Sequence, residues 1–138
     1  MTAKEYLRQA YMLDKVINSK MDSLTELRSL AEKASSVMTG LPGSPIKDNS
    51  KIENTIIKIM DAEQELNEII DKLVDLKREI SRCIDCVPNR EQAFLLEQRY
   101  IHCKKWEEVG REFNYTPRNL MRAHKRALMA IEKYIPQN

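Results

Sequence analysis

The sequence predicts an all-α protein, in which a long antiparallel, coiled-coil-like helical hairpin precedes a unit of three shorter helices. Its 138 residues include only three Gly and five Pro, and 6% are aromatic, so the turns and side chains typical of β-rich folds are scarce. Charged residues make up 32% of the chain, as is typical of long exposed helices. In two long stretches, apolar residues recur at alternating spacings of four and three, which is the heptad pattern of paired helices.

The first predicted helix covers residues 3–38, because no Gly or Pro interrupts the chain before Gly40. Only Lys20 breaks its apolar seam. The seam consists of Tyr6, Ala10, Leu13, Ile17, Leu24, Leu27, Ala31, Ala34 and Met38. Residues 40–49, GLPGSPIKDN, are expected to form a loop, since Gly, Pro and short polar residues cluster there.

The second predicted helix runs from about Ser50 to Cys86, with Ser50 as its N-cap and Glu53 completing a capping box. Two helices of similar length joined by a short loop form an antiparallel hairpin, which we expect to be a domain of residues 1–87. The seam of the second helix consists of Ile52, Ile56, Ile59, Glu63, Leu66, Ile70, Leu73, Lys77, Ile80 and Ile84.

The apolar faces of the hairpin are wider than one seam, because Val16 and Leu30 flank the first stripe and Ile57 and Met60 flank the second. Two helices do not cover such a face by themselves. We therefore expect a homodimer. The alternatives are that the C-terminal part folds back on this face, or that the flanking residues are ordinary partly buried positions.

The C-terminal domain is expected to span residues 88–138 and to begin where Val87-Pro88-Asn89 ends the second helix. Asn89 starts a third helix that covers residues 90–102, and a short helix follows from Trp106 to Phe113. Thr116 and Pro117 are a strong start signal for the last helix, which runs to about Tyr134.

The last two helices meet the requirements of a helix-turn-helix. Gly110 provides a small residue where the helices cross, and Asn114 tolerates the left-handed backbone of the turn. The inward face of the last helix consists of Leu120, Ala123, Ala127, Leu128 and Ile131, and basic residues fall near the opposite side. His124 lies near the boundary between the two faces, where it has a packing or a phosphate-binding role.

The charge is unevenly distributed along the chain. Residues 1–87 hold 13 Lys/Arg and 15 Asp/Glu, a net charge of −2, whereas residues 88–138 hold 10 and 6, a net charge of +4. This split is typical of a basic functional end on a near-neutral support.

The run REQAFLLEQRYIHCKKWEEVGREFNYTPRNLMRAHKRALMAIEKY, residues 90–134, resembles region 4 of bacterial sigma factors. The matching positions are Arg90, Glu91, Leu95, Arg99, Tyr100, Glu107, Glu108, Val109, Gly110, Phe113, Thr116, Leu120, Ala127, Leu128 and Ile131. The whole chain also looks like small phage- and prophage-encoded putative transcriptional regulators of Gram-positive bacteria, which join a helical N-terminal half to such a C-terminus. Nothing in the chain resembles sigma regions 2 or 3.

The resemblance places the DNA-facing positions at Pro117, Arg118, Asn119, Met121 and Arg122. Arg118 and Arg122 are suited to bidentate contact with guanine, and Asn119 to contact with adenine. The side chains expected to meet phosphates are Arg99, Lys104, Lys105, Lys125 and Arg126. Pro117 and Met121 depart from the polar readers usual in sigma factors, so specificity for the −35 element does not carry over.

The three cysteines do not make a disulfide framework. No metal site is expected, with one alternative: Cys83 and Cys86 of a CxxC, with His102 and Cys103, are ligands of suitable type for structural zinc. The alternative for Cys83 is an ordinary small apolar residue of the second helix. We find no phosphate loop, nucleophile elbow or HExxH motif, so no enzymatic activity and no cofactor are expected.

The sequence therefore predicts a cytoplasmic, phage-type transcriptional regulator, with no signal peptide or membrane span. Its expected partner is double-stranded DNA, and RNA polymerase is a candidate by analogy with region 4. The hairpin is expected to mediate dimerisation or partner contact. The alternative functions are a small-terminase-like DNA-packaging component and a protein-interaction adaptor that does not bind DNA.

Overall fold

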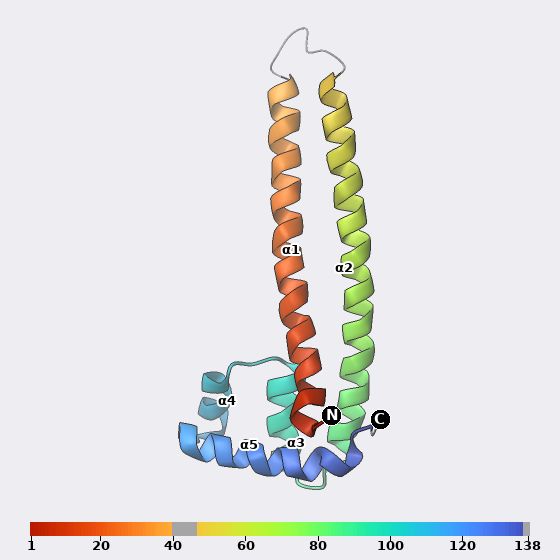
Figure 1. The fold of residues 1–138 in the computed structure, drawn as a ribbon. Helices are drawn as coiled ribbons and strands as arrows, with labels where there is room; N and C mark the ends of the chain where they lie inside the picture. Colours follow the sequence, from red (N-terminus) through yellow and green to blue (C-terminus); the bar gives the residue numbers. More distant parts are fainter. Residues whose placement is uncertain (40–46, 137–138) are drawn as a thin grey trace. The chain divides into compact units, whose positions relative to one another are not determined.

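The computed structural model describes the backbone of residues 1–39 and 47–136 and the side chains of residues 1–34 and 50–136. The elements in order are α1 (Ala3–Thr39), α2 (Lys47–Asp85), α3 (Arg90–Leu96), the π-helical turn η1 (Glu97–Ile101), α4 (Trp106–Phe113), α5 (Pro117–Ile131) and the 3₁₀ turn η2 (Glu132–Tyr134). These described ranges contain helices and turns but no strand, which confirms the predicted all-α class (Figure 1).

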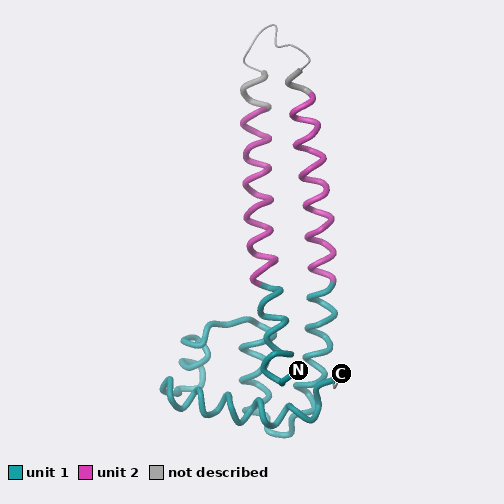
Figure 2. Tube along the Cα trace, in the orientation of Figure 1, with its two compact units in different colours: residues 1–14, 72–138 teal, residues 15–71 magenta. Residues whose placement is uncertain are grey.

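The chain divides into two compact units, which Figure 2 distinguishes by colour. Unit 1 consists of residues 1–14 and 72–138, and unit 2 consists of residues 15–71. The first turns of α1 and the last turns of α2 therefore belong to the same unit as the C-terminal helices. This grouping differs from the boundary expected after residue 87, because the ends of the long helices pack with the C-terminal helices in one core.

Unit 2 is the antiparallel hairpin formed by the remainder of α1 and α2. Ile17 and Leu24 of α1 and Leu66 of α2 are buried in it, as the predicted seams require. Arg28 Nη2 lies 2.6 Å from Glu63 Oε1 and links the two helices. Both side chains are about half exposed, so this ion pair contributes less than about 1 kcal/mol, and apolar packing holds the helices together.

The expected start of α2 is wrong. The helix begins at Lys47 rather than at Ser50, so Ser50 is not its N-cap and residues 47–49 are helical rather than part of a loop. These residues include neither Gly nor Pro, so a nucleated helix extends through them at little cost. The rest of the expected loop, residues 40–46, lies outside the described residues.

The buried stripe of α2 is wider than the predicted seam, whose positions other than Ile56 are all half-buried or buried. Ile56, which was expected in the seam, is 47% exposed. The half-buried or buried residues on the other side of the stripe are Thr55, Ala62, Ile69, Leu76 and Cys83. Both series share Ile52, Ile59, Leu66, Leu73 and Ile80, so α2 is packed on both flanks of this central row, whereas the predicted seam included only one of them.

Unit 1 has a core to which all of its α-helical segments contribute. Leu7 of α1, Ile80 of α2 and Leu96 of α3 are fully buried. Val109 of α4 and Ile131 of α5 are equally inaccessible. α5 packs against α4, which directly precedes it, and against α3, which lies about twenty residues earlier in the chain.

The third predicted helix begins as expected but changes its form. The Asn89 side chain caps α3 by accepting a hydrogen bond of 3.1 Å from the backbone N–H of Gln92. The α-helix ends at Leu96 and continues as the π turn, in which the His102 N–H donates to the Glu97 carbonyl. Cys103 then adopts the left-handed region with φ of 54°. Only the first half of the helix expected over residues 90–102 is therefore α-helical.

Candidate nucleic-acid interface

The turn between α4 and α5 is closed by backbone hydrogen bonds around Asn114. Asn114 has φ of 56° and ψ of 38°, the left-handed conformation that the sequence predicted for it. The N–H of Tyr115 donates to the carbonyl of Gly110 at 2.9 Å, and the N–H of Asn114 donates to that of Arg111 at 3.3 Å. Together these bonds form a Schellman motif, which ends α4 and directs the chain into the next helix.

Gly110 lies where α4 meets α5, as expected of the small residue in a helix-turn-helix. It is buried, and a Cβ built on it lies 3.5 Å from both Leu120 Cδ2 and the Tyr115 carbonyl oxygen. Those are ordinary van der Waals distances. The crossing therefore requires a small residue but has room for one methyl group.

α5 begins at the residue that the sequence indicated. The Thr116 hydroxyl accepts a hydrogen bond of 3.2 Å from the N–H of Asn119, and Pro117 occupies the first turn. Proline costs nothing there, because the first N–H groups of a helix have no intrahelical partner. The start of α5 is thus set by local chemistry.

The buried face of α5 includes His124, which is only 4% exposed. Its Nε2 lies 2.7 Å from the Tyr100 hydroxyl oxygen, and its ring meets the Trp106 ring edge-on at 4.5 Å. Burial, together with the positive charges of Lys4 and Arg99, lowers the pKa of His124 to about 4. His124 therefore has a packing role as a neutral ring rather than a position at the boundary. The other fully buried members of the face are Leu120, Ala127 and Ile131.

The exposed face of α5 is basic. Arg118, Arg122, Lys125 and Arg126 are all exposed, and no Asp or Glu occurs between Pro117 and Ile131. At about 100° per residue, the centre of these four cations is roughly opposite the centre of the buried residues. Asn119 is also exposed, beside Arg118. The structure therefore brings five of the predicted site residues together on one helix.

An open, mainly apolar groove of about 570 Å³ lies between α4 and the first turn of α5. Trp106, Gly110, Pro117 and Met121 are among its lining residues. Met121 is 53% exposed. The two residues that depart from the sigma pattern, Pro117 and Met121, therefore lie next to the basic face and present apolar surface there.

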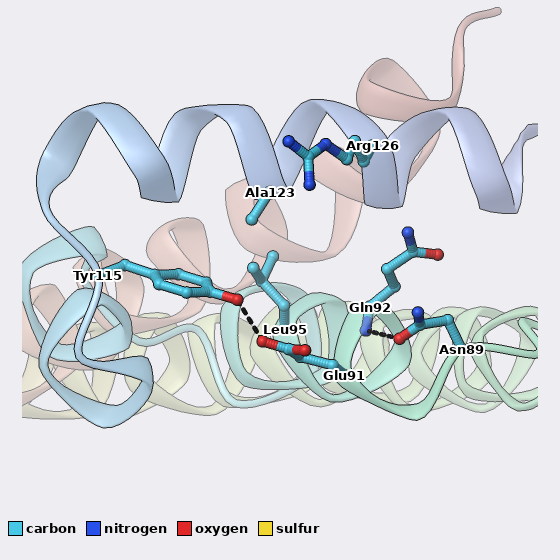
Figure 3. Close-up of a pocket in the computed structure, with 7 residues that line it drawn as sticks. All are labelled: Asn89, Glu91, Gln92, Leu95, Tyr115, Ala123 and Arg126. Carbon is cyan, nitrogen blue, oxygen red and sulfur yellow. Dashed lines mark hydrogen bonds between the residues drawn. The ribbon is translucent and has the colours of Figure 1, made fainter.

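Arg126 lies at the edge of the basic face that adjoins α3. It lines a small hollow of about 90 Å³ with Glu91, Gln92 and Tyr115 (Figure 3). Figure 3 shows Tyr115 reaching from the turn toward α3, where its hydroxyl donates a hydrogen bond to the Glu91 carboxylate. This bond raises the pKa of Tyr115 and joins the turn to α3.

The structure places the remaining predicted cations on the segment that leads into α4. Arg99 is half-buried between two rings, with its Cζ 4.2 Å from the Tyr11 centroid and 4.5 Å from that of Trp106. Its Nη1 donates to the Lys104 carbonyl at 2.8 Å. The Lys104 ammonium pairs with Glu112, whereas Lys105 is exposed at the residue that precedes α4. The phosphate role of these three residues stays a prediction.

The cysteines of the zinc alternative occupy three different environments. Cys83 is buried, Cys86 is exposed, and Cys103 is half-buried with its thiol directed at the Tyr100 carbonyl. The Nε2 of His102 lies 3.7 Å from Oε1 of Glu97. Burial raises the pKa of both Cys83 and Cys103, which disfavours the thiolate that a metal requires. Among the described residues, no three His, Cys, Asp or Glu side chains are arranged to hold a metal ion.

Sequence reasoning missed two cations of α1. Lys4 and Arg8 lie beside Arg99, Tyr100 and His124 in unit 1. This proximity arises from packing between segments about ninety residues apart, so no local sequence pattern indicated it. In the described part of the chain, no helix has both the length and the apolar character that a membrane span needs.

Comparisons with known proteins found no family model that matches the chain, and no curated protein or solved structure that is similar to it.

Proposed function

We propose that this protein binds double-stranded DNA through α5 and acts as a transcriptional regulator of the phage type. The observation that carries the DNA-binding part is the geometry of α5. Its basic face is opposite its buried face, contains no carboxylate, and follows a helix-turn-helix turn closed by a Schellman motif. The transcriptional role rests on the resemblance of residues 90–134 to sigma region 4.

The side chains suit a major groove in particular ways. Arg118 and Arg122 are one helical turn apart and each matches the two acceptors of guanine, while Asn119 matches adenine. Met121 and Pro117 offer apolar surface, which suits the methyl group of thymine. Lys125 and Arg126 lie further along α5 and suit phosphates, which position a protein on DNA without reading sequence.

The proposed role of unit 2 is dimerisation. Exposed apolar side chains support it, since Ile57 and Met60 are 54% and 62% exposed, and Leu30 is 59% exposed. Exposed apolar residues in such number on one hairpin favour association. The oligomeric state, measured by light scattering during size-exclusion chromatography, tests this part. A dimer supports it, whereas a monomer favours an adaptor and a ring of eight or more copies favours DNA packaging.

The DNA-binding proposal is tested by selecting duplexes from a random pool at a stated salt concentration, then measuring their affinity by fluorescence anisotropy. Arg118→Ala/Arg122→Ala is compared with Lys20→Ala/Lys58→Ala, which removes the same charge from exposed positions of unit 2. Each bidentate contact is worth about 1–3 kcal/mol, so the first variant should lose at least about tenfold in affinity relative to the second. Equal affinities of the two folded variants, or no enrichment from the pool, would refute the proposal.

A further inference from the structure

A second basic surface lies beside α5, in a hollow of about 200 Å³ within unit 1. Its cationic lining consists of Lys4 and Arg8 of α1 and Arg99 of η1. The remaining lining residues are Tyr11, Tyr100, Trp106, Met121 and His124, so no carboxylate lines it. A water molecule takes up about 30 Å³ of the liquid, so the hollow accommodates a small anion together with water.

Arg99 is held in a fixed position at this hollow. The Tyr11 and Trp106 rings enclose its guanidinium, and the Lys104 carbonyl accepts from its Nη1. Its Nε is buried and, within the described residues, has no hydrogen-bond partner. A guanidinium that is already ordered loses little entropy when it binds an anion. Arg99 therefore provides an ordered positive charge for an anion in the hollow.

Lys4 and Arg8 add two exposed charges to the hollow, one turn apart on α1. The positive charges around the hollow affect the pKa values of two residues that line it, His124 and Tyr100. Lys4 and Arg99 contribute, after burial, to the lowered pKa of His124. Arg99 and Arg8 partly offset the burial that raises the pKa of Tyr100 to about 12. Since His124 is neutral, the hollow carries three positive charges that no lining side chain balances.

The hollow adjoins the face of α5 that we propose for DNA. Met121 and His124 of α5 line it, and Met121 lies between Arg118 and Arg122 in sequence. At about 100° per residue, Lys125 lies between Met121 and the centre of the basic face. The positive surface of α5 is therefore extended toward Lys4 and Arg8 of α1.

We propose that Lys4, Arg8 and Arg99 bind a phosphate group in this hollow, and that its source is the DNA backbone next to the groove occupied by α5. This inference rests on the proposed DNA-binding function. It assigns to the start of α1 a direct part in binding, and it gives Arg99 a fixed position in that contact. The other source of the same chemistry is a free phosphate compound.

The test measures the affinity of the full chain for its selected duplex and for a scrambled duplex at several salt concentrations. Each phosphate contact contributes about 0.9 to the slope of log affinity against log salt. Lys4→Ala/Arg8→Ala should reduce this slope by about 1–2 and weaken both duplexes equally, because phosphate contacts carry no sequence information. The Lys20→Ala/Lys58→Ala control should keep the wild-type slope. Thermal unfolding verifies folding, and Lys4→Gln/Arg8→Gln serves as the second variant.

A calorimetric titration with pyrophosphate separates the two sources. If Lys4→Ala/Arg8→Ala leaves the DNA slope unchanged but abolishes pyrophosphate binding, the hollow takes a free phosphate compound and the DNA assignment is overturned. If it changes neither, the whole inference is overturned. Failure of the wild type to bind any DNA would overturn the proposed function, and the pyrophosphate titration then still decides whether the hollow binds phosphate.

Discussion

His124 is the residue through which pH is expected to act on this fold. It is 4% exposed in the middle of α5, between Tyr100 and Trp106, with the charges of Lys4 and Arg99 nearby. Its burial and these two positive charges favour its neutral form. Its pKa is lowered from 6.5 to about 4 in the folded protein, whereas in the unfolded chain it titrates near 6.5.

The consequence for stability follows from proton linkage. Between about pH 6.5 and 4 the unfolded chain binds a proton at this residue and the folded chain does not. The free energy of unfolding therefore decreases as the pH falls through this window, by about 3 kcal/mol in total, and this contribution levels off below pH 4. Above pH 6.5 the full contribution is present.

The measurement is urea unfolding followed by circular dichroism at several pH values from 7 to 4. The His124→Gln variant keeps a polar side chain near Tyr100 but does not titrate. Carboxylates also titrate in this range, so the relevant quantity is the free energy of unfolding of the wild type minus that of the variant. This difference should decrease by about 3 kcal/mol from pH 7 to pH 4. His102→Gln, at an exposed histidine, should follow the wild type. Parallel curves for wild type and His124→Gln would refute the reasoning.

Two further predictions concern the turn between α4 and α5. Gly110→Ala should be tolerated or should stabilise by about 0.5–1 kcal/mol in urea unfolding, because a Cβ meets its neighbours at 3.5 Å and Ala favours the helix. Gly110→Leu should destabilise by about 1–3 kcal/mol, and the reverse order would contradict the packing described here. Asn114→Val should cost about 1–2 kcal/mol because of its left-handed backbone, while Asn114→Gly should not, and equal stability of these two variants would rule out that conformation.

Much of the fold could be predicted because it depends on local chemistry. The long heptad stretches determine α1 and α2, since apolar residues at those spacings form a continuous stripe only on a helix. The caps at Asn89 and Thr116 and the left-handed residue Asn114 are set by side chains that bond or tolerate their own backbone, so they were found from the sequence. The start of α2 was not found from the sequence, because Lys47, Asp48 and Asn49 are compatible with either a loop or a first helical turn.

The candidate site was predictable only in part. Arg118, Arg122 and Lys125 share one face of α5 through helical periodicity alone, so the sequence located them. The environment of Arg99 could not be predicted from the sequence. Tyr11 contacts it from α1, which is distant in sequence, and Trp106 contacts it from the start of α4. For the same reason His124 was expected at a boundary, although it is 4% exposed and contacts Tyr100 and Trp106.

By itself the sequence determined the helical class, the pattern of apolar stripes and the turn chemistry, because each of these depends on interactions over a few residues. Only the tertiary structure decided that α2 is packed on both flanks of its central stripe, where the third helix changes to a π turn, and how Lys4 and Arg8 of α1 come to lie beside Arg99. These features depend on contacts across the whole of each unit. Such contacts depend on side-chain volume and burial, which the short-range periodicity of the sequence does not specify.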